Sequence, residues 1–328
     1  MSIIITTIVS ALSPTNSDFS SFVTPNDRDL VQELLADKRS ANTRRAYQRD
    51  LKDFFNAVAG ANPTPALVAE FLSLERFRAV SVVLEYKATL LEKGLAEATI
   101  NRRLASIKAL VDFARKIGKC DFTLQDIAGE KVHSYRDTTG ISADSFKALL
   151  AIPNRSTLKG KRDYALLLLL WGNALRRGEV ASANIEDLDL EAGTLKIRGK
   201  GKGTQAEMIT LGMKAIVALS EWLEARGETD TRQPLFTSTH KGYWGERLST
   251  TSIYKIVRDS AHRAGIEKVI SPHRIRHSSI TTALDKTDGN VRKVQKLSRH
   301  AKFETLMRYD DNRTNAQKEI TEVLDDLL

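Results

Sequence analysis

The sequence contains only one cysteine, Cys120, in 328 residues. A single cysteine excludes an intramolecular disulfide and a cysteine-based metal site, and it fits a protein of the reducing cytoplasm. The histidines are also few, and none of them forms a His-x-His pair that could bind a nuclease metal. Asp187 and Asp189 lack a third partner in the sequence. We therefore expect no metal site. The six histidines are His133, His240, His262, His273, His277 and His300.

Long apolar runs are missing as well. The most apolar stretch, residues 165–171, is too short to cross a bilayer and is typical of a buried helix. Residues 1–12 are largely apolar, but they lack the Lys or Arg that stands before the apolar run of a signal peptide, which argues against one. We therefore expect a flexible tail over residues 1–24, no membrane association and a cytoplasmic location.

Charge of one sign is in excess. The 50 Lys and Arg residues outnumber the 41 Asp and Glu residues, giving a net charge of +9. Such an excess favours a polyanionic partner, most simply nucleic acid.

Residues 25–130 have a helical pattern and form the first predicted domain. Asn42 or Thr43 can cap a helix with its apolar residues on one face, and another helix begins near Thr99. Basic residues on the outer faces of these helices could lie along DNA phosphates or could simply be solvated. These candidate DNA-binding residues are Arg44, Arg45, Arg49, Arg102, Arg103 and Lys108.

A polar linker over residues 131–141 precedes a second predicted domain, residues 142–312, whose first helix Ser142 can cap. Residues 194–198 and 205–210 alternate like two strands on either side of a glycine-rich, basic tip, which predicts a hairpin. The tip lacks the residue order of a nucleotide-binding phosphate loop. The expected fold class is mainly α with a small antiparallel sheet.

Three short motifs in this domain carry reactive groups. Arg176 and Glu179 lie at a turn after the buried helix. In the second motif Ser271 and Pro272 suit a helix start, so His273 and Arg276 would share one helix face near the positive end of the helix dipole, where a phosphate binds well. In the third, Tyr309 follows nine residues after His300.

Together these motifs resemble the tyrosine recombinase, or phage integrase, family. That family carries an arginine box, a hairpin lysine, a His-x-x-Arg box and a histidine followed by a tyrosine, in the order found here. Lys200, at the hairpin tip, matches the lysine, and residues 40–47 resemble the start of the family's helical core-binding domain. The likeness covers about residues 25–313. One departure is Ser298-Arg299-His300, which stands where Leu-Gly-His is usual.

The resemblance implies a DNA strand exchange through a 3′-phosphotyrosine on Tyr309, without a cofactor. Arg176 and Arg276 would bind the phosphate oxygens, and Lys200 would protonate the leaving 5′-oxygen. His273 and His300 would assist these steps, and supporting or DNA-binding roles would fall to Glu179 and Lys202.

The implied partner is double-stranded DNA with specific recombination sites, bound by a homotetramer on two sites. A narrow apolar stripe recurs along residues 313–328, which predicts a short C-terminal helix for oligomerisation. It could dock on its own catalytic domain, but the resemblance favours a neighbouring subunit.

Two other functions remain as alternatives. A type IB topoisomerase would relax DNA with the same chemistry and no second site. A DNA-binding regulator on the same scaffold would have lost a catalytic group, and none is missing.

Overall fold

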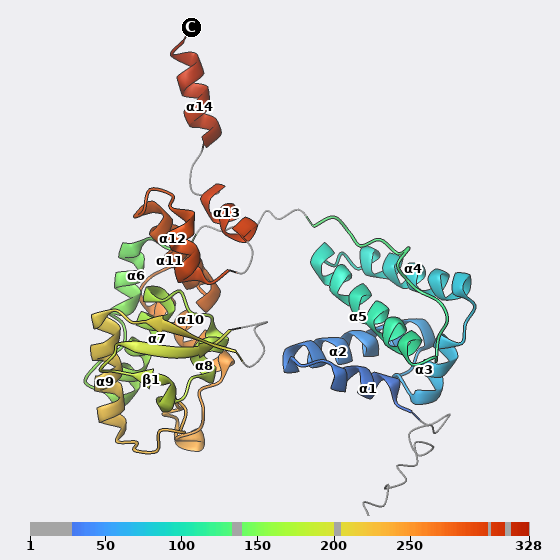
Figure 1. Cartoon of the computed structure of the whole chain (residues 1–328), viewed down its shortest axis with the longest axis horizontal. Coiled ribbons are helices and arrows are strands. Elements are labelled where there is room, and N and C mark those ends of the chain that lie inside the picture. The colour runs from blue at the N-terminus through green and yellow to red at the C-terminus, as the bar shows by residue number, and fades with distance from the viewer. Residues whose placement is uncertain (1–27, 133–139, 200–204, 301–302, 312–315, 328) are drawn as a thin grey trace, which may run out of the picture. The chain divides into compact units, whose positions relative to one another are not determined.

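The computed structural model describes residues 28–132, 140–199, 205–300, 303–311 and 316–327. These fall into two compact units, which divide between Tyr135 and Arg136 (Figure 1). Among the residues described, no helix is both long and apolar enough to span a membrane.

The first unit is a bundle of helices around an apolar core. Leu51, Phe54 and Phe55 are buried on the second helix, and Phe54 meets the Tyr86 ring edge to face with centroids 5.2 Å apart. Val58, four residues after Phe54 and next to the last residue of this helix, is exposed. The helices are α1 (Leu30–Asp37), α2 (Ala41–Ala59), α3 (Pro65–Leu72), α4 (Arg76–Glu92) and α5 (Glu97–Lys116).

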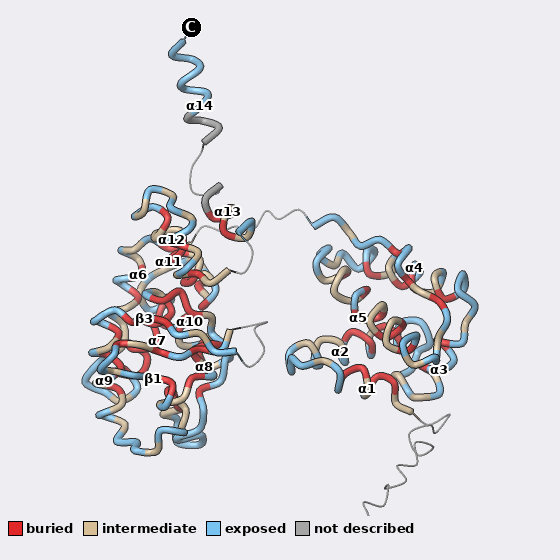
Figure 2. Tube along the Cα trace, viewed as in Figure 1, coloured by how far each residue is buried: buried red, intermediate tan, exposed pale blue. Residues whose placement is uncertain are grey.

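The second unit is built around α7 (Leu158–Gly172), which is largely buried and packs against α9, α11, α6 and α8 (Figure 2). Its run of leucines fills the core, as the apolar stretch predicted. The other helices are α6 (Ala143–Leu150), α8 (Arg177–Ser182), α9 (Met213–Arg226), α10 (Thr250–Arg263), α11 (Pro272–Asp285), α12 (Val291–Ser298), α13 (Phe303–Asp311) and α14 (Ala316–Asp325).

One antiparallel sheet of order β1–β2–β3 lies in this unit, formed by β1 (Leu188–Asp189), β2 (Thr194–Arg198) and β3 (Ala206–Thr210). Leu195 and Ile209 are partners across β2 and β3 and point into the core, while their neighbours point outward. The expected hairpin is therefore confirmed, as is the fold class, mainly helical with a small antiparallel sheet.

The chain enters the second unit by packing on α11. The Ile141 N–H donates to the Ser278 hydroxyl at 2.8 Å. A Cβ atom on Gly140 would lie only 2.0 Å from that hydroxyl oxygen, so the position has no room for a side chain. Ser142 then caps α6 through a bond from the Ser145 N–H, as predicted.

Candidate active site

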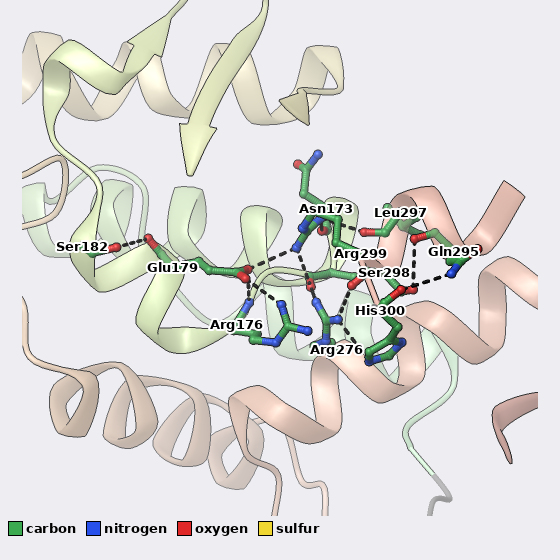
Figure 3. A network of polar contacts seen from close by, with 11 residues as sticks. Asn173, Arg176, Glu179, Ser182, Arg276, Gln295, Leu297, Ser298, Arg299 and His300 are labelled. Atoms are coloured by element: carbon green, nitrogen blue, oxygen red, sulfur yellow. Dashed lines mark hydrogen bonds and ion pairs between the residues drawn. The ribbon is translucent and has the colours of Figure 1, made fainter. Parts of the chain in front are cut away.

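Arg276 is the centre of a polar network that joins three segments of the second unit (Figure 3). Ser271 caps α11 and Pro272 occupies its first turn, so Arg276 lies one turn into the helix with its side chain buried. Its guanidinium donates to the carbonyls of Ala174 and Ser298. The same guanidinium lies 3.4 Å from Nε2 of His300.

Arg176 is held by Glu179 at the start of α8. The Glu179 carboxylate accepts from Arg176 Nη1 at 2.7 Å and from the Arg176 backbone N–H at 2.8 Å. Burial alone would raise the pKa of Glu179, but these bonds and the positive charges of Arg299 and Arg176 outweigh it and lower the pKa. Glu179 is therefore ionised at neutral pH and fixes the direction of the Arg176 side chain.

Arg299 also reaches this carboxylate, from the end of α12. Its Nη2 lies 3.1 Å from Glu179 Oε2, and its side chain is almost fully buried. In the sequence Arg299 stands out only because it replaces the glycine that is usual in the family motif. A buried arginine beside a site carboxylate could not be recognised in sequence, because α8 and α12 are far apart along the chain.

Tyr309, on α13, is buried beside the histidines. Its ring stacks on His277 with centroids 4.0 Å apart, and the His300 ring lies 5.7 Å away. His273 comes next, with its ring 5.9 Å from that of His277. The resemblance gave His273 an assisting role in the reaction, whereas His277 is the histidine whose ring stacks on that of Tyr309.

Electrostatics in this cluster reflect its burial and its positive charge. Burial and the neighbouring Arg176 lower the pKa of Arg276 to about 10, so Arg276 keeps its charge at neutral pH. Burial and the charge of Arg276 lower the pKa of His300 to about 4. At neutral pH His300 is therefore a neutral imidazole, which can still donate one N–H to a phosphate oxygen.

Two of the predicted residues, Lys200 and Lys202, lie outside the described residues. The strands that flank them, β2 and β3, are described on both sides of the tip. The structure therefore brings together five of the six predicted catalytic residues. These are Arg176, His273, Arg276, His300 and Tyr309.

The basic residues of the first unit divide into two groups. Arg44, Arg45 and Arg49 are exposed on α2. Arg102 and Arg103 on α5 are less exposed and form ion pairs with Asp50 and Asp53 of α2, and Arg49 lies 3.8 Å from the same Asp50 carboxylate.

Lys108, also on α5, donates to the carbonyl of Ile127 at 2.7 Å. The basic residues of α5 therefore also hold the parts of their own unit together.

Within the described ranges, no group of three or more His, Cys, Asp or Glu residues is arranged to hold a metal ion.

Comparison with known proteins gives two family matches. Residues 140–316 match the model of the phage integrase family, and residues 29–118 match the model of the phage integrase N-terminal SAM-like domain. A tyrosine recombinase of Synechocystis sp. is 52% identical over 303 residues, covering 92% of this chain and 96% of the relative. One of Synechococcus elongatus is 51% identical, covering 92% and 94%.

Solved structures share the fold at lower identity. XerH site-specific recombinase bound to a palindromic difH substrate aligns with a TM-score of 0.65 and 20% identity, covering 90% of this chain and 84% of that one. A lambda integrase dimer bound to a core site aligns with a TM-score of 0.62 and 14% identity, covering 87% and 94%.

Proposed function

The chain belongs to the phage integrase family and is a tyrosine recombinase that carries out site-specific DNA recombination; we propose that Tyr309 is its nucleophile. The supporting observation is the position of Tyr309, which is buried against His277 and close to His300 and its partner Arg276. A phenol in that place has two imidazole rings beside it, and one of them contacts the guanidinium of Arg276.

The reaction would begin with attack of the Tyr309 oxygen on the scissile phosphorus. A bond forms between that oxygen and the phosphorus, the phosphorus–O5′ bond breaks, and a 3′-phosphotyrosine remains. Arg176 and Arg276 would bind the non-bridging oxygens with forked donors that are already fixed by the network. The 3′-phosphotyrosine conserves the energy of the broken phosphodiester bond, so attack of a 5′-hydroxyl on its phosphorus rejoins the DNA and releases Tyr309.

Proton transfer needs an acceptor for the phenol and a donor for the 5′-oxygen. We assign the acceptor role to the histidine pair His273 and His277, because His277 contacts the Tyr309 ring directly. Lys200 is our candidate for the donor, because β2 and β3 carry the hairpin whose tip includes it.

The proposed function is tested by trapping the covalent intermediate. Cleavage of a nicked suicide substrate releases a short fragment that carries the 5′-hydroxyl. Without that hydroxyl the DNA cannot be rejoined, and the protein stays attached to the 3′ end. We expect trapped protein on the recombination site with EDTA present and ATP absent, visible as a retarded band on a denaturing gel. Cleavage that leaves no protein on the DNA would contradict the proposal.

The role of Lys200 gives a separate prediction. A 5′-phosphorothiolate substrate releases a thiolate, which needs no proton to leave. We expect Lys200→Ala to cleave ordinary DNA about 100-fold or more slowly and to recover most of its rate on the sulfur substrate. Lys202→Ala is the comparison variant: as a DNA-binding residue it should affect cleavage of both substrates to the same degree and gain nothing from the sulfur. If Lys200→Ala stays slow on the sulfur substrate, Lys200 positions DNA instead.

We further propose that the first domain, residues 25–130, binds double-stranded DNA opposite the catalytic domain, residues 142–312. The exposed arginines of α2 supply phosphate contacts for such a clamp. The XerH structure contains a recombination-site substrate and the lambda integrase structure contains a dimer on DNA, which supports a DNA-bound oligomer here. A cytoplasmic location of the protein fits its proposed substrate, double-stranded DNA.

The oligomer we propose is a tetramer on two sites, joined by the C-terminal helix α14. Ile320, Val323 and Leu324 on this helix, and Leu327 just after it, are each more than half exposed. A helix this short is marginal alone, so its apolar stripe needs a partner surface, which we assign to the catalytic domain of a neighbouring subunit.

Truncation after residue 313 is therefore expected to leave single-site affinity within about threefold while abolishing paired-site complexes. Gel shift with one site, and bridging of two labelled sites, measure the two properties. Ile320→Ser with Leu324→Ser should act like the truncation, whereas Asp325→Asn is the matched control on the same helix. A truncated protein that still pairs and recombines two sites would refute docking in trans.

A further inference from the structure

Arg299 ends α12 in a backbone conformation that favours glycine. Its φ is 55° and its ψ is 35°, and its N–H closes the helix by donating to the carbonyl of Gln295 at 2.7 Å. The Cβ atom of any other residue is crowded there, so arginine costs free energy that glycine would avoid. The tyrosine recombinase motif usually has glycine at this position. The side chain of Arg299 must therefore contribute something that offsets the backbone cost.

Both terminal nitrogens of the Arg299 guanidinium are engaged inside the protein, while its buried Nε has no hydrogen-bond partner among the described residues. Nη1 donates to the carbonyls of Asn173 at 3.0 Å and Leu297 at 2.7 Å. Nη2 donates to the Ala174 carbonyl at 3.3 Å and to Glu179 Oε2 at 3.1 Å (Figure 3). Only 4% of the side chain is exposed, compared with 32% for Arg176. All four bonds of Arg299 thus end on protein acceptors.

Two of these acceptors also hold the phosphate-binding arginines. The Glu179 carboxylate receives Arg299 on one side and Arg176 on the other. The Ala174 carbonyl accepts from Arg276 as well as from Arg299. Ala174 itself has a φ of 47°, so the turn that presents its carbonyl is in the left-handed region and needs support. Arg299 therefore contacts the anchors of both arginines at once.

We propose that Arg299 is a positioning residue for DNA cleavage: it fixes Glu179 and the Asn173–Ala174 turn so that Arg176 and Arg276 are aligned to receive the scissile phosphate. The inference rests on the proposed function, since it concerns how Arg176 and Arg276, proposed there to bind the phosphate, are held in position. It makes Arg299 a positioning residue and not a catalytic one, because the bonds of its side chain end on Glu179 and on backbone carbonyls.

Loss of the Arg299 guanidinium would act through Glu179. The carboxylate would keep Arg176 as its close partner, with Arg276 the other positive group facing it, but one oxygen would lose its buried ion pair. The pKa of Glu179 would then rise, because burial raises it and the charge of Arg299 no longer opposes that effect. Protonated Glu179 cannot hold Arg176 by an ion pair, so cleavage should become sensitive to acid.

The test compares Arg299→Met, Arg299→Gly and Arg299→Lys in the full-length protein. Single-turnover cleavage of the suicide substrate and affinity for the site are measured from about pH 8 to about pH 6. We expect Met and Gly to slow cleavage about 30- to 100-fold, with affinity within about threefold, because alignment matters most in the transition state. Their rates should fall further as the pH drops, and Lys should restore part of the rate.

Arg162→Met is the matched control. Arg162 is equally buried and ion-paired, to Asp163 at 2.6 Å, but it belongs to a different part of the unit and should leave the cleavage rate of folded protein within about twofold. Circular dichroism reports whether each variant folds, and Arg299→Gly removes the backbone strain that could confuse the comparison.

The outcomes separate this inference from the proposed function. If wild-type protein is trapped on DNA but Arg299→Met and Arg299→Gly cleave within about threefold of it, with the same pH profile, positioning by Arg299 is wrong. If these variants fail to fold while Arg162→Met folds, Arg299 serves folding and the inference is also overturned. Failure of wild-type protein to form any covalent complex would instead contradict the proposed function.

Discussion

Tyr309→Phe is expected to abolish covalent trapping on the suicide substrate while leaving DNA binding intact. Phenylalanine lacks the oxygen that attacks phosphorus, so the cleavage rate should fall by at least about 10⁴-fold. The ring is kept, and with it the stacking on His277 at 4.0 Å, so the site should stay folded. A denaturing gel measures the trapped fraction, and a native gel shift measures the affinity.

Tyr164→Phe provides the control for this substitution. Tyr164 is a partly buried tyrosine on α7 whose ring lies 4.5 Å from the Arg155 guanidinium carbon, away from the network. Removing its hydroxyl should leave trapping unchanged. Covalent complex formed by Tyr309→Phe at a rate near that of wild type would show that another residue is the nucleophile.

Arg276→Lys should produce the second largest loss, about 10³-fold in the cleavage rate. Lysine keeps the positive charge but has one ammonium group in place of a planar fork. It cannot bond the carbonyls of Ala174 and Ser298 together, as Arg276 does, and still reach a phosphate. A lower melting temperature is also expected, since a buried carbonyl would lose its donor. Single-turnover cleavage and thermal unfolding measure the two effects.

Arg226→Lys serves as the matched control for Arg276→Lys. The Arg226 side chain is 8% exposed and donates to the Pro234 carbonyl at 2.5 Å. Its substitution therefore tests the effect of losing a buried arginine that is not part of the active site. This variant should unfold at a lower temperature but cleave normally once folded. Normal cleavage by Arg276→Lys as well would mean that charge alone is needed there and that the fork is not.

Local signals in the sequence predicted much of what the structure shows. The caps at Ser142 and Ser271 depend only on residues within one turn, so the starts of α6 and α11 were predictable. The start of α2 was not placed correctly, because Ser40, Asn42 and Thr43 can each cap a helix and Ser40 is the one that does. The β2–β3 hairpin followed from alternation on either side of glycines.

Contacts between distant segments could not be predicted in the same way. The basic pattern of α5 gave no sign that Arg102 and Arg103 pair with aspartates of α2, because helix packing decides which charges meet. The same holds for Arg299, whose partners come from the α7–α8 turn and from α8. His277, too, became prominent only once α13 placed Tyr309 over its ring.

The packing of Gly140 on Ser278 limits where this enzyme could be rebuilt as a chimera. Ser278 lies on α11, the helix that carries His273 and Arg276, so the first residues of the catalytic unit are bonded to the helix of the active site. A foreign DNA-targeting module could replace the first unit if the junction lies before Gly140. A fusion joined after Gly140, or any side chain introduced there, would push on that helix and reduce cleavage even with every reactive group still present.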